Sequence, residues 1–356
     1  MRQHLYILIL IFTLPLKTAG QSPNYSFDTD IFMLRNTIMP EFQYHYDDYT
    51  QYAPAALMVG LKACGYEGRS SWSRMLVSDA FSVASMATLV NGIKYSAQRL
   101  RPDASTYNSF PSGHTATAFM TATMLHKEYE GRNKWISIGG YSLAALTGVS
   151  RVMNNRHWMT DVMAGAVIGI GSVHLGYFIT DKIFKDKHLN PGYETPELCY
   201  DPGVKHYVAE ILMGSRFILG SEDQKLVGIL PQRGSMAGLQ IEIPLIPSTG
   251  VSARATTNSM IFHNSLCCDL YTVSAGGYWN LPFARLFEFQ TKLMAGWARM
   301  NNGNGMDISG GVSISLITDN YFKIKVFGEF ESISPFTTQA PWFNIITAGF
   351  STGFFW

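Results

Sequence analysis

The sequence is poor in cysteine and in charged residues. Its four cysteines in 356 residues are Cys64, Cys199, Cys267 and Cys268. Their spacing matches no metal site and assigns no disulfide, so no chemistry is expected from them. Charged residues make up 15% of the chain and sum to a net charge of +1, which gives no reason to expect a nucleic-acid partner. The chain also has no internal repeat and no low-complexity tract.

Long apolar runs are scarce as well. Helix-like runs at 53–64, 75–93, 115–125 and 135–149 are too short for a bilayer or carry a charge, such as Lys62 or Asp79. The exception is 162–180, where Gly165, Gly169 and other small residues recur at four-residue spacing. This run fits either a membrane helix or a tightly packed core helix.

The first 20 residues are typical of a secretory signal. They begin with Arg2, continue through the apolar run 5–16 and end in small residues, which predicts cleavage before Gln21. A retained membrane anchor is the alternative, although the run is short for a span. No cysteine follows the predicted cleavage site, which argues against lipid attachment there. The mature protein is therefore predicted to be exported.

Three polar clusters lie between residues 94 and 161. Their main members are Lys94 and Arg101; Ser112, Gly113 and His114; and Arg151, His157 and Asp161. They combine three cations, with no easy carboxylate partner expected nearby, with two histidines, one aspartate and a Ser-Gly turn. This inventory fits a phosphate pocket with a nucleophile and a proton donor.

The chemistry of the cations and of the turn supports a phosphate site. A phosphate dianion is held best by several charge-assisted donors, which Lys94, Arg101 and Arg151 can supply. Ser112 and Gly113 precede an apolar, helix-compatible run, so their turn is expected at a helix N-terminus. Free backbone N–H groups and the helix dipole attract anions there, and glycine permits close approach.

His157 and Asp161 are four residues apart and share one face if the segment is helical. The aspartate could then accept the proton of one ring nitrogen and leave the other nitrogen free to attack phosphorus. Each residue alone has an ordinary alternative. A histidine is more often structural, isolated Lys and Arg are usually solvated, and Pro-Ser-Gly-His can be a plain turn into a helix. The joint order and spacing favour a site.

The patterns Lys-x6-Arg-Pro, Pro-Ser-Gly-His and Ser-Arg-x5-His-x3-Asp resemble the three-part signature of the type 2 phosphatidic acid phosphatase and vanadium haloperoxidase superfamily. All three parts are complete over residues 94–161, and the resemblance extends to the helical region from about 52 to 182. One departure is the short gap of eight residues, 103–110, between the first two parts. It argues against an inserted lid there and leaves open how a substrate is enclosed.

The resemblance implies a role for each residue. His157 would attack phosphorus to form a phosphohistidine, Asp161 would orient it, and His114 would protonate the leaving oxygen. The groups that would hold the non-bridging oxygens are Lys94, Arg101, Arg151, Ser112 and the backbone N–H of Gly113. No metal or other cofactor is implied for the phosphatase reaction, whereas the haloperoxidase branch holds vanadate in the same pocket.

After residue 205 the periodicity changes from helical to alternating. Residues 183–205 contain Pro191, Pro196 and Pro202 and are predicted to be a linker. Further on, apolar residues such as Phe322 and Ile324 alternate with charged ones. This alternation predicts about eight strands, near 207–219, 226–230 with 236–245, 250–261, 266–281, 285–299, 306–317, 321–332 and 342–356.

An antiparallel barrel of about eight strands fits the alternation. Such a barrel has no free edges, can turn an apolar face to lipid and fills its interior with side chains, where Lys and Glu can pair. Phe350, Phe354 and Trp356 share one face and resemble the terminal aromatic strand of bacterial outer-membrane barrels. A soluble barrel or sandwich is the alternative, because alternation does not distinguish lipid from a protein core.

The complete prediction is a multidomain protein with a signal peptide over 1–20, an all-α helical-bundle phosphatase domain over 21–182, a linker over 183–205 and an antiparallel β-barrel over 206–356. Residues 22–52 are expected to be a lead-in segment packed on the helical domain. That domain is expected in the periplasm, tethered to the outer membrane by the barrel. Residues 162–180 must then form a core helix, since a membrane helix there would halt the chain at the inner membrane.

The predicted activity is that of an exported acid phosphatase acting on phosphate monoesters, lipid phosphates or lipid pyrophosphates. The alternatives are an inner-membrane lipid phosphatase with a soluble β-domain, a vanadium-dependent haloperoxidase, and a non-enzymatic barrel that serves as an anchor, pore or adhesin. The expected partners are a phosphorylated lipid or small phosphate ester, membrane lipid and the outer-membrane assembly machinery, without nucleic acid.

Overall fold

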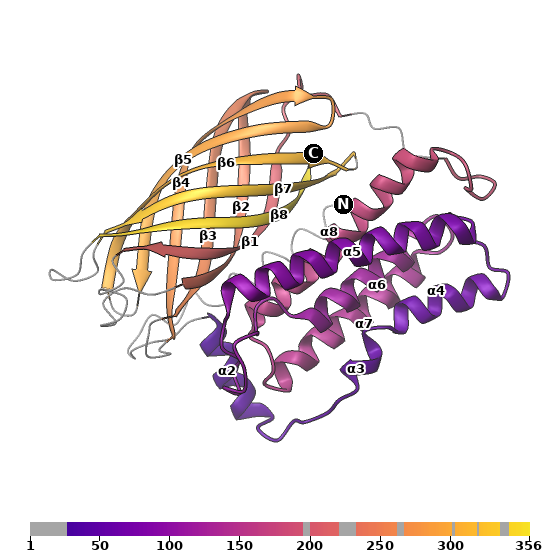
Figure 1. The fold of residues 1–356 in the computed structure, drawn as a ribbon, viewed down its shortest axis with the longest axis horizontal. Coiled ribbons are helices and arrows are strands. Elements are labelled where there is room, and N and C mark those ends of the chain that lie inside the picture. The colour runs from indigo at the N-terminus through magenta and orange to yellow at the C-terminus, as the bar shows by residue number, and fades with distance from the viewer. Residues whose placement is uncertain are drawn as a thin grey trace.

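The computed structural model describes residues 27–194, 200–220, 233–261, 267–300, 303–318, 320–334 and 342–356. The predicted signal peptide, Cys199 and the predicted strand segment 226–230 lie outside these ranges. Within them, the chain folds into a helical bundle followed by a closed antiparallel barrel, which lies beside the bundle (Figure 1). The predicted fold class is confirmed, and the closed barrel excludes a sandwich.

The described helical part contains five helices where the sequence predicts them and two more in the lead-in segment. They are α2 (Phe27–Ile38), α3 (Asp47–Thr50), α4 (Ala53–Ala63), α5 (Trp72–Ala97), α6 (Gly113–Tyr129), α7 (Lys134–Met153) and α8 (Met159–Phe184). Both α5 and α8 have 26 residues and are apolar enough to cross a membrane by length and composition, with mean hydropathies of 1.4 and 1.7. The expectation that Asp79 disqualifies the α5 segment is therefore corrected.

Helix α8 is the central helix of the bundle, because glycines let its neighbours approach closely. A Cβ atom at Gly165 would lie 2.4 Å from the carbonyl oxygen of Ser112, at the start of α6. A Cβ atom at Gly176 would lie 2.2 Å from Oγ of Ser82 on α5. Larger side chains at either position would push these helices apart, so the glycine spacing in 162–180 reflects helix packing.

The barrel contains the eight predicted strands. They are β1 (Val208–Leu219), β2 (Arg233–Ile246), β3 (Thr249–Ile261), β4 (Cys267–Ala284), β5 (Phe287–Met300), β6 (Gly303–Ile317), β7 (Phe322–Ile333) and β8 (Phe343–Phe355). Each strand pairs antiparallel with the next, and β8 pairs with β1 to close the barrel, with Phe355 opposite Val208. Closure satisfies the backbone groups that an edge strand would leave open.

The barrel interior is filled with ion pairs. Lys325 Nζ lies 2.7 Å from Glu210 and 3.1 Å from Glu242, while Arg216 lies 2.6 Å from Glu331. All of these side chains are buried. The alternation in the sequence thus corresponds to charged residues that face inward and apolar residues that face outward, as predicted.

The bundle contacts the outer wall of the barrel rather than one of its ends. Ser96 Oγ on α5 lies 2.6 Å from Ser215 Oγ on β1. The His174 ring of α8 stacks on Phe322 of β7, with centroids 4.0 Å apart. One hydrophobic core joins both halves, because buried α8 residues such as Ile168 cluster with Phe350 of β8. The side-by-side arrangement is therefore built from packed contacts.

Candidate active site

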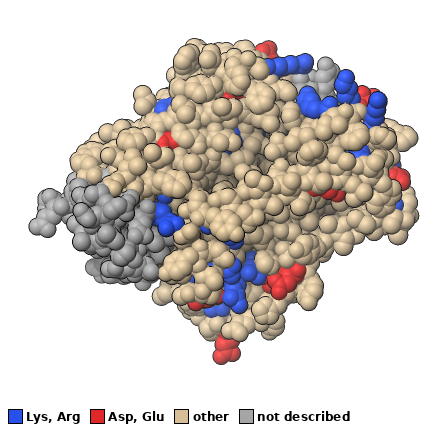
Figure 2. Space-filling model, in the orientation of Figure 1, with Lys and Arg blue, Asp and Glu red and all other residues tan. Residues whose placement is uncertain are grey.

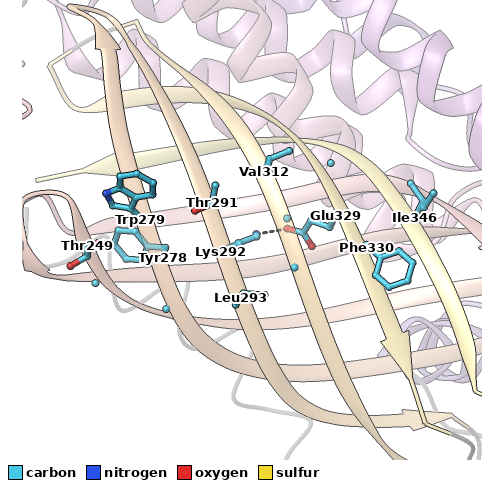
Figure 3. Close-up of a pocket in the computed structure, with 15 residues that line it drawn as sticks. Thr249, Tyr278, Trp279, Thr291, Lys292, Leu293, Val312, Glu329, Phe330 and Ile346 are labelled. Carbon is cyan, nitrogen blue, oxygen red and sulfur yellow. Dashed lines mark ion pairs between the residues drawn. The ribbon is translucent and has the colours of Figure 1, made fainter.

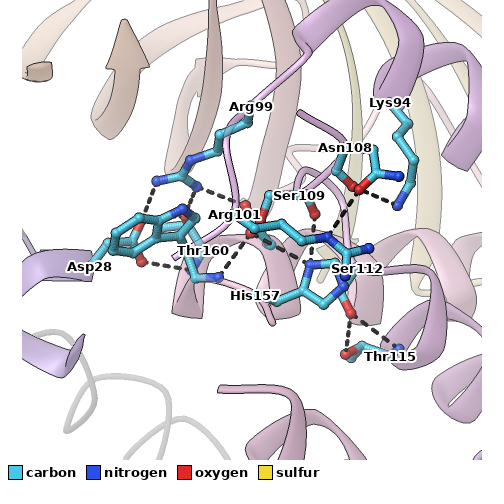
Figure 4. A network of polar contacts seen from close by, with 12 residues as sticks. Asp28, Lys94, Arg99, Arg101, Asn108, Ser109, Ser112, Thr115, His157 and Thr160 are labelled. Carbon is cyan, nitrogen blue, oxygen red and sulfur yellow. Dashed lines mark hydrogen bonds and ion pairs between the residues drawn. The ribbon is translucent and has the colours of Figure 1, made fainter. Parts of the chain in front are cut away.

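The three polar clusters meet at one end of the bundle, where α5 and α7 end and α6 and α8 begin (Figure 4). All eight predicted site residues lie at this end: Lys94, Arg101, Ser112, Gly113, His114, Arg151, His157 and Asp161. The antiparallel packing of the helices accounts for the convergence, since it brings alternate helix ends to the same level. The loop from 98 to 112 closes one side.

A main-chain hydrogen bond holds the His157 ring. The side chain is 2% exposed, and its Nδ1 lies 2.7 Å from the carbonyl oxygen of Ser109. A carbonyl can only accept, so Nδ1 carries the ring proton and Nε2 keeps a free lone pair. Asp161 Oδ2 lies 3.6 Å from the same Nδ1. The nearest acceptor is therefore Ser109, and the predicted partner Asp161 is the next one.

Burial lowers the pKa of His157 to about 4. Lys94 and Arg151 act in the same direction, and together these effects outweigh the attraction of Asp161 for the protonated ring. His157 is consequently neutral above about pH 4, in the form that a nucleophile requires.

Asp161 is held from three sides although its side chain is fully buried. It accepts hydrogen bonds from the backbone N–H of Trp158 at 2.9 Å, from Arg99 Nη1 at 2.7 Å and from the hydroxyl of Ser109. Ser109 thus contacts both members of the His157 and Asp161 pair, through its carbonyl and its hydroxyl. This shared contact fixes their relative positions.

Arg99 is a buried cation that the sequence analysis did not single out. Its Nη2 lies 2.7 Å from Asp28 of α2, and its Nη1 lies 2.6 Å from Thr160 Oγ1 as well as close to Asp161. Arg99 therefore links the lead-in helix α2 to the start of α8. Its place in the first cluster, two residues before Arg101, is the only local signal for this role, because Asp28 is 71 residues away in the chain.

Asn108 positions two of the predicted phosphate-binding cations. Lys94 Nζ donates to its main-chain carbonyl at 2.9 Å, and Arg101 Nε donates to its side-chain Oδ1 at 2.9 Å. An ammonium group has three donors and a guanidinium group has five, so both cations keep donors for a phosphate. The short connection 103–110 thus orders the pocket through Asn108 and Ser109, a role that its length did not suggest.

Arg151 has a carboxylate partner, contrary to the sequence-based expectation. Its Nη1 donates to Asp47 Oδ2, and Asp47 is fully buried in α3. The expectation failed because the lead-in segment folds back over the end of α7. Among the described residues, the Nε–H of Arg151 is buried and has no hydrogen-bond partner.

The Ser-Gly turn lies at the N-terminus of α6, as predicted. Ser112 caps the helix, because its Oγ accepts from the backbone N–H of Thr115 at 3.4 Å and from the Thr115 hydroxyl at 2.9 Å. A Cβ atom at Gly113 would meet nothing within 4 Å. The backbone at Gly113 therefore borders open space at the start of α6, which suits an anion.

His114 faces the second carboxylate of α3. Its Nε2 lies 2.9 Å from Asp48 Oδ1. Burial and the nearby Arg151 lower the pKa of His114, whereas the hydrogen bond and charge of Asp48 act against this change. Asp47 and Asp48 are adjacent in the segment that was predicted only to pack on the helical domain. They pair with one predicted phosphate ligand, Arg151, and with the predicted proton donor, His114.

Comparison with known proteins agrees with the helical part of this structure. Residues 76–185 match the PAP2 superfamily. The lipid A 1-phosphatase of Porphyromonas gingivalis is 40% identical over 238 residues, which cover 66% of this chain and 52% of that protein. This chain therefore spans about half the length of that curated relative.

Two solved structures are each similar to part of the chain. The crystal structure of LpxE from Aquifex aeolicus has 22% sequence identity and a TM-score of 0.34, covering 43% of this chain and 95% of that one. The crystal structure of Neisserial surface protein A has 9% identity and a TM-score of 0.35, covering 42% of this chain and 96% of that one. The sequence match to the PAP2 superfamily covers residues 76–185, which include most of α5 and all of α6, α7 and α8.

Proposed function

We propose that this protein is a lipid phosphatase that works through a phosphohistidine on His157. The observation that carries the proposal is the state of the His157 ring, in which Nδ1 is held by Ser109 and Nε2 is free. Lys94, Arg101 and Arg151 lie close enough to influence one another electrostatically, and they can supply donors for a phosphate. The proposal thus has two parts, a lipid phosphate as the substrate and a phosphohistidine mechanism.

In the first step, the lone pair of His157 Nε2 attacks phosphorus. The bond from phosphorus to the leaving oxygen breaks, and protonated His114 transfers its proton to that oxygen. Negative charge on the non-bridging oxygens is stabilised by Lys94, Arg101 and Arg151. The products are the free alcohol and a phosphohistidine.

In the second step, water attacks phosphorus and the bond to His157 breaks. His114, now neutral, accepts a proton from the water and returns to its charged form. Inorganic phosphate leaves and His157 recovers its lone pair. Asp161 contacts neither reacting atom in this scheme, and it acts by holding His157 in place together with Ser109.

We propose a lipid as the alcohol part of the substrate. The similarity to a lipid A 1-phosphatase supports this class, and the barrel supports a membrane location because its charges face inward and its apolar residues face outward. The proposal includes export and insertion of the barrel into an outer membrane. Insertion would require the assembly machinery of that membrane.

The substrate class can be tested with the full-length protein in detergent micelles. A lipid monophosphate and the soluble ester p-nitrophenyl phosphate are compared by phosphate release. We expect kcat/KM to be at least about tenfold higher for the lipid, because the binding energy of its apolar part contributes to transition-state stabilisation. The His157→Ala variant provides the background. Equal values for the two esters would contradict the lipid assignment but not the mechanism.

The two histidines predict an acidic optimum and a defined response to Asp48→Asn. In the free enzyme, His157 must be neutral and His114 protonated, so kcat/KM should fall below about pH 4 and again at a pH below the ordinary histidine value of 6.5. Asp48 stabilises the protonated ring of His114, so its removal lowers the pKa further. The alkaline limb should move to lower pH, and kcat/KM at pH 7 should fall by roughly two- to tenfold.

The acidic limb is the internal control for Asp48→Asn, because Asp48 is not among the groups that shift His157. It should stay in place. A uniform loss of activity at all pH values, with both limbs unmoved, would show that Asp48 acts on the structure of the site and not on the proton of His114.

A further inference from the structure

The outer wall of the barrel and the exposed faces of the helices are both apolar. On the barrel, Leu293 is 73% exposed and Val326 is 62% exposed. On the bundle, Leu76 of α5 is 60% exposed and Leu146 of α7 is 59% exposed. Only 17% of the most apolar stretch of α5 is buried. Such large apolar faces on both halves indicate that the bundle and the barrel are surrounded by the same apolar medium.

Charged residues mark the limits of the apolar surface on each half. Helix α7 has a lysine at Lys134 and an arginine at Arg151, and the 16 residues between them carry no charge. At 1.5 Å per residue they span about 24 Å, close to the roughly 25 Å apolar band of membrane barrels. On the barrel, pairs such as Lys292 with Glu329 lie on the inner side of the wall (Figure 3). Figure 2 shows that charged side chains are sparse across the middle of the face in view.

Exposed aromatic side chains lie toward both ends of the apolar surface. Trp72 and Trp135 begin α5 and α7 at the end away from the phosphate pocket, on the side where Trp356 ends the barrel. Tyr95 and Tyr107 lie at the pocket end. Tryptophan and tyrosine favour the two membrane–water interfaces, so this placement matches a bilayer in thickness and in composition.

The contacts between the bundle and the barrel show which end of the barrel lies nearer to the phosphate pocket. His174 of α8 stacks on Phe322, which begins β7 at the barrel end that also holds Tyr207 and Trp356. Asp161 is 13 residues before His174, or about 20 Å away along the helix. Ser96, near the pocket, contacts Ser215 toward the other end of β1. The pocket therefore lies on the side of the barrel opposite to the chain end.

The two barrel ends differ in their connections. At the end near Trp356, β2 and β3 are joined across residues 247–248 and β4 and β5 across 285–286. At the opposite end, β5 and β6 are joined across 301–302, but β1 and β2 are joined by the longer segment 220–232 and β7 and β8 by 334–342. Outer-membrane barrels have short periplasmic turns and longer extracellular loops. This asymmetry assigns the pocket end to the outer face of the membrane.

We infer that the helical bundle and the barrel are embedded side by side in one lipid bilayer, with the phosphate pocket at its outer interface. The pocket then takes phosphorylated headgroups of lipids in the outer leaflet, while their acyl chains lie against the apolar surface. The inference rests on the proposed function for the identity of the substrate. It replaces the sequence-based expectation that the helical domain hangs in the periplasm, together with the argument that a membrane helix before the barrel would halt the chain at the inner membrane.

Spin labels test whether both halves contact lipid. The full-length protein, with its native cysteines replaced by serine, carries one cysteine at Leu146→Cys on α7, Leu293→Cys on β5 or Gln43→Cys in an exposed loop. Each variant is labelled in phosphatidylethanolamine and phosphatidylglycerol vesicles. We expect the labels at 146 and 293 to collide mainly with oxygen, and the label at 43 mainly with a water-soluble nickel chelate. A water-accessible label at 146 beside a lipid-accessible one at 293 would overturn the shared bilayer.

Two matched replacements of alanine by cysteine test which side of the membrane the pocket faces. Ala104→Cys lies in the loop beside the pocket, and Ala284→Cys lies at the short-turn end of β4; both residues are exposed. In intact cells of a two-membrane bacterium, a membrane-impermeant maleimide should label 104 at once and 284 only after the outer membrane is permeabilised. Labelling of both from one side, or in the reverse order, would overturn the inference. Neither labelling result depends on phosphate release. A failure of this inference can therefore be told apart from a failure of the proposed phosphatase activity.

Discussion

We expect His157→Ala to lower kcat/KM for phosphate release on the order of 10⁴-fold or more. The loss should be this large because Nε2 of His157 is the atom proposed to bond to phosphorus, and the described pocket places no second neutral imidazole in the same position. His114 is hydrogen-bonded to Asp48 and is needed as the acid. Purified full-length protein and a lipid monophosphate give the measurement.

A trapping experiment separates loss of the nucleophile from loss of the fold. Wild-type protein mixed with ³²P-labelled substrate and quenched in alkali should carry acid-labile label, and His157→Ala should carry none. His126→Ala is the matched control, because His126 contacts Ser137 and Glu130 on the side of α6 away from the pocket. It should keep both activity and label. Label that persists in His157→Ala would disprove the assigned nucleophile.

Arg99→Leu should destabilise the helical domain by about 3 to 5 kcal/mol. Arg99 is buried between Asp28 and Asp161, at 2.7 Å from each. Leucine would leave two carboxylates without a counter-charge in a place that water does not reach. The remaining folded protein should also lose about tenfold or more in activity, because Asp161 would no longer be held beside His157. Denaturant unfolding followed by helical circular dichroism measures the first effect.

Two variants check the cause of this destabilisation. Arg156→Leu removes an arginine whose side chain is 41% exposed and which pairs with Asp103 at 3.0 Å, so it should cost less than about 1 kcal/mol. Combining Arg99→Leu with Asp28→Asn removes one of the uncompensated charges and should recover part of the stability. If Arg99→Leu unfolds at the same denaturant concentration as the wild type, the buried network does not stabilise the domain.

The secondary structure was predictable because its signals are local. The alternation of Phe322 and Ile324 with Lys323 and Lys325 identifies a strand with two different faces, and the same period recurs through the C-terminal half. The predicted helix at 75–93 was shorter than α5, because periodicity does not mark where a helix ends. Helix α2 was missed although Ile31, Leu34 and Ile38 recur at helical spacing, so its signal was present but not used. Helix α3 has four residues, too few to show a period.

The candidate site was predictable to the extent that its residues form short patterns. Eight residues follow from three clusters, and the structure brings all eight to one end of the bundle. The partners that orient them come from elsewhere: Asp28, Asp47 and Asp48 lie in the lead-in segment, and Asn108 and Ser109 lie in a loop without a pattern. Pairs such as Arg151 with Asp47 are 104 residues apart, so no spacing within a cluster reveals them.

The sequence by itself determined the order of a helical and a strand-forming half and the residues that supply the phosphate-site chemistry. Both follow from periodicity and from side-chain type, which are properties of neighbouring residues. Only the tertiary structure decided that Ser109 lies nearer than Asp161 to the His157 proton, that α3 covers Arg151 and His114, and that the bundle lies along the barrel wall. These contacts depend on how distant surfaces pack, and packing is set by the shapes of elements that the chain brings together only when it folds.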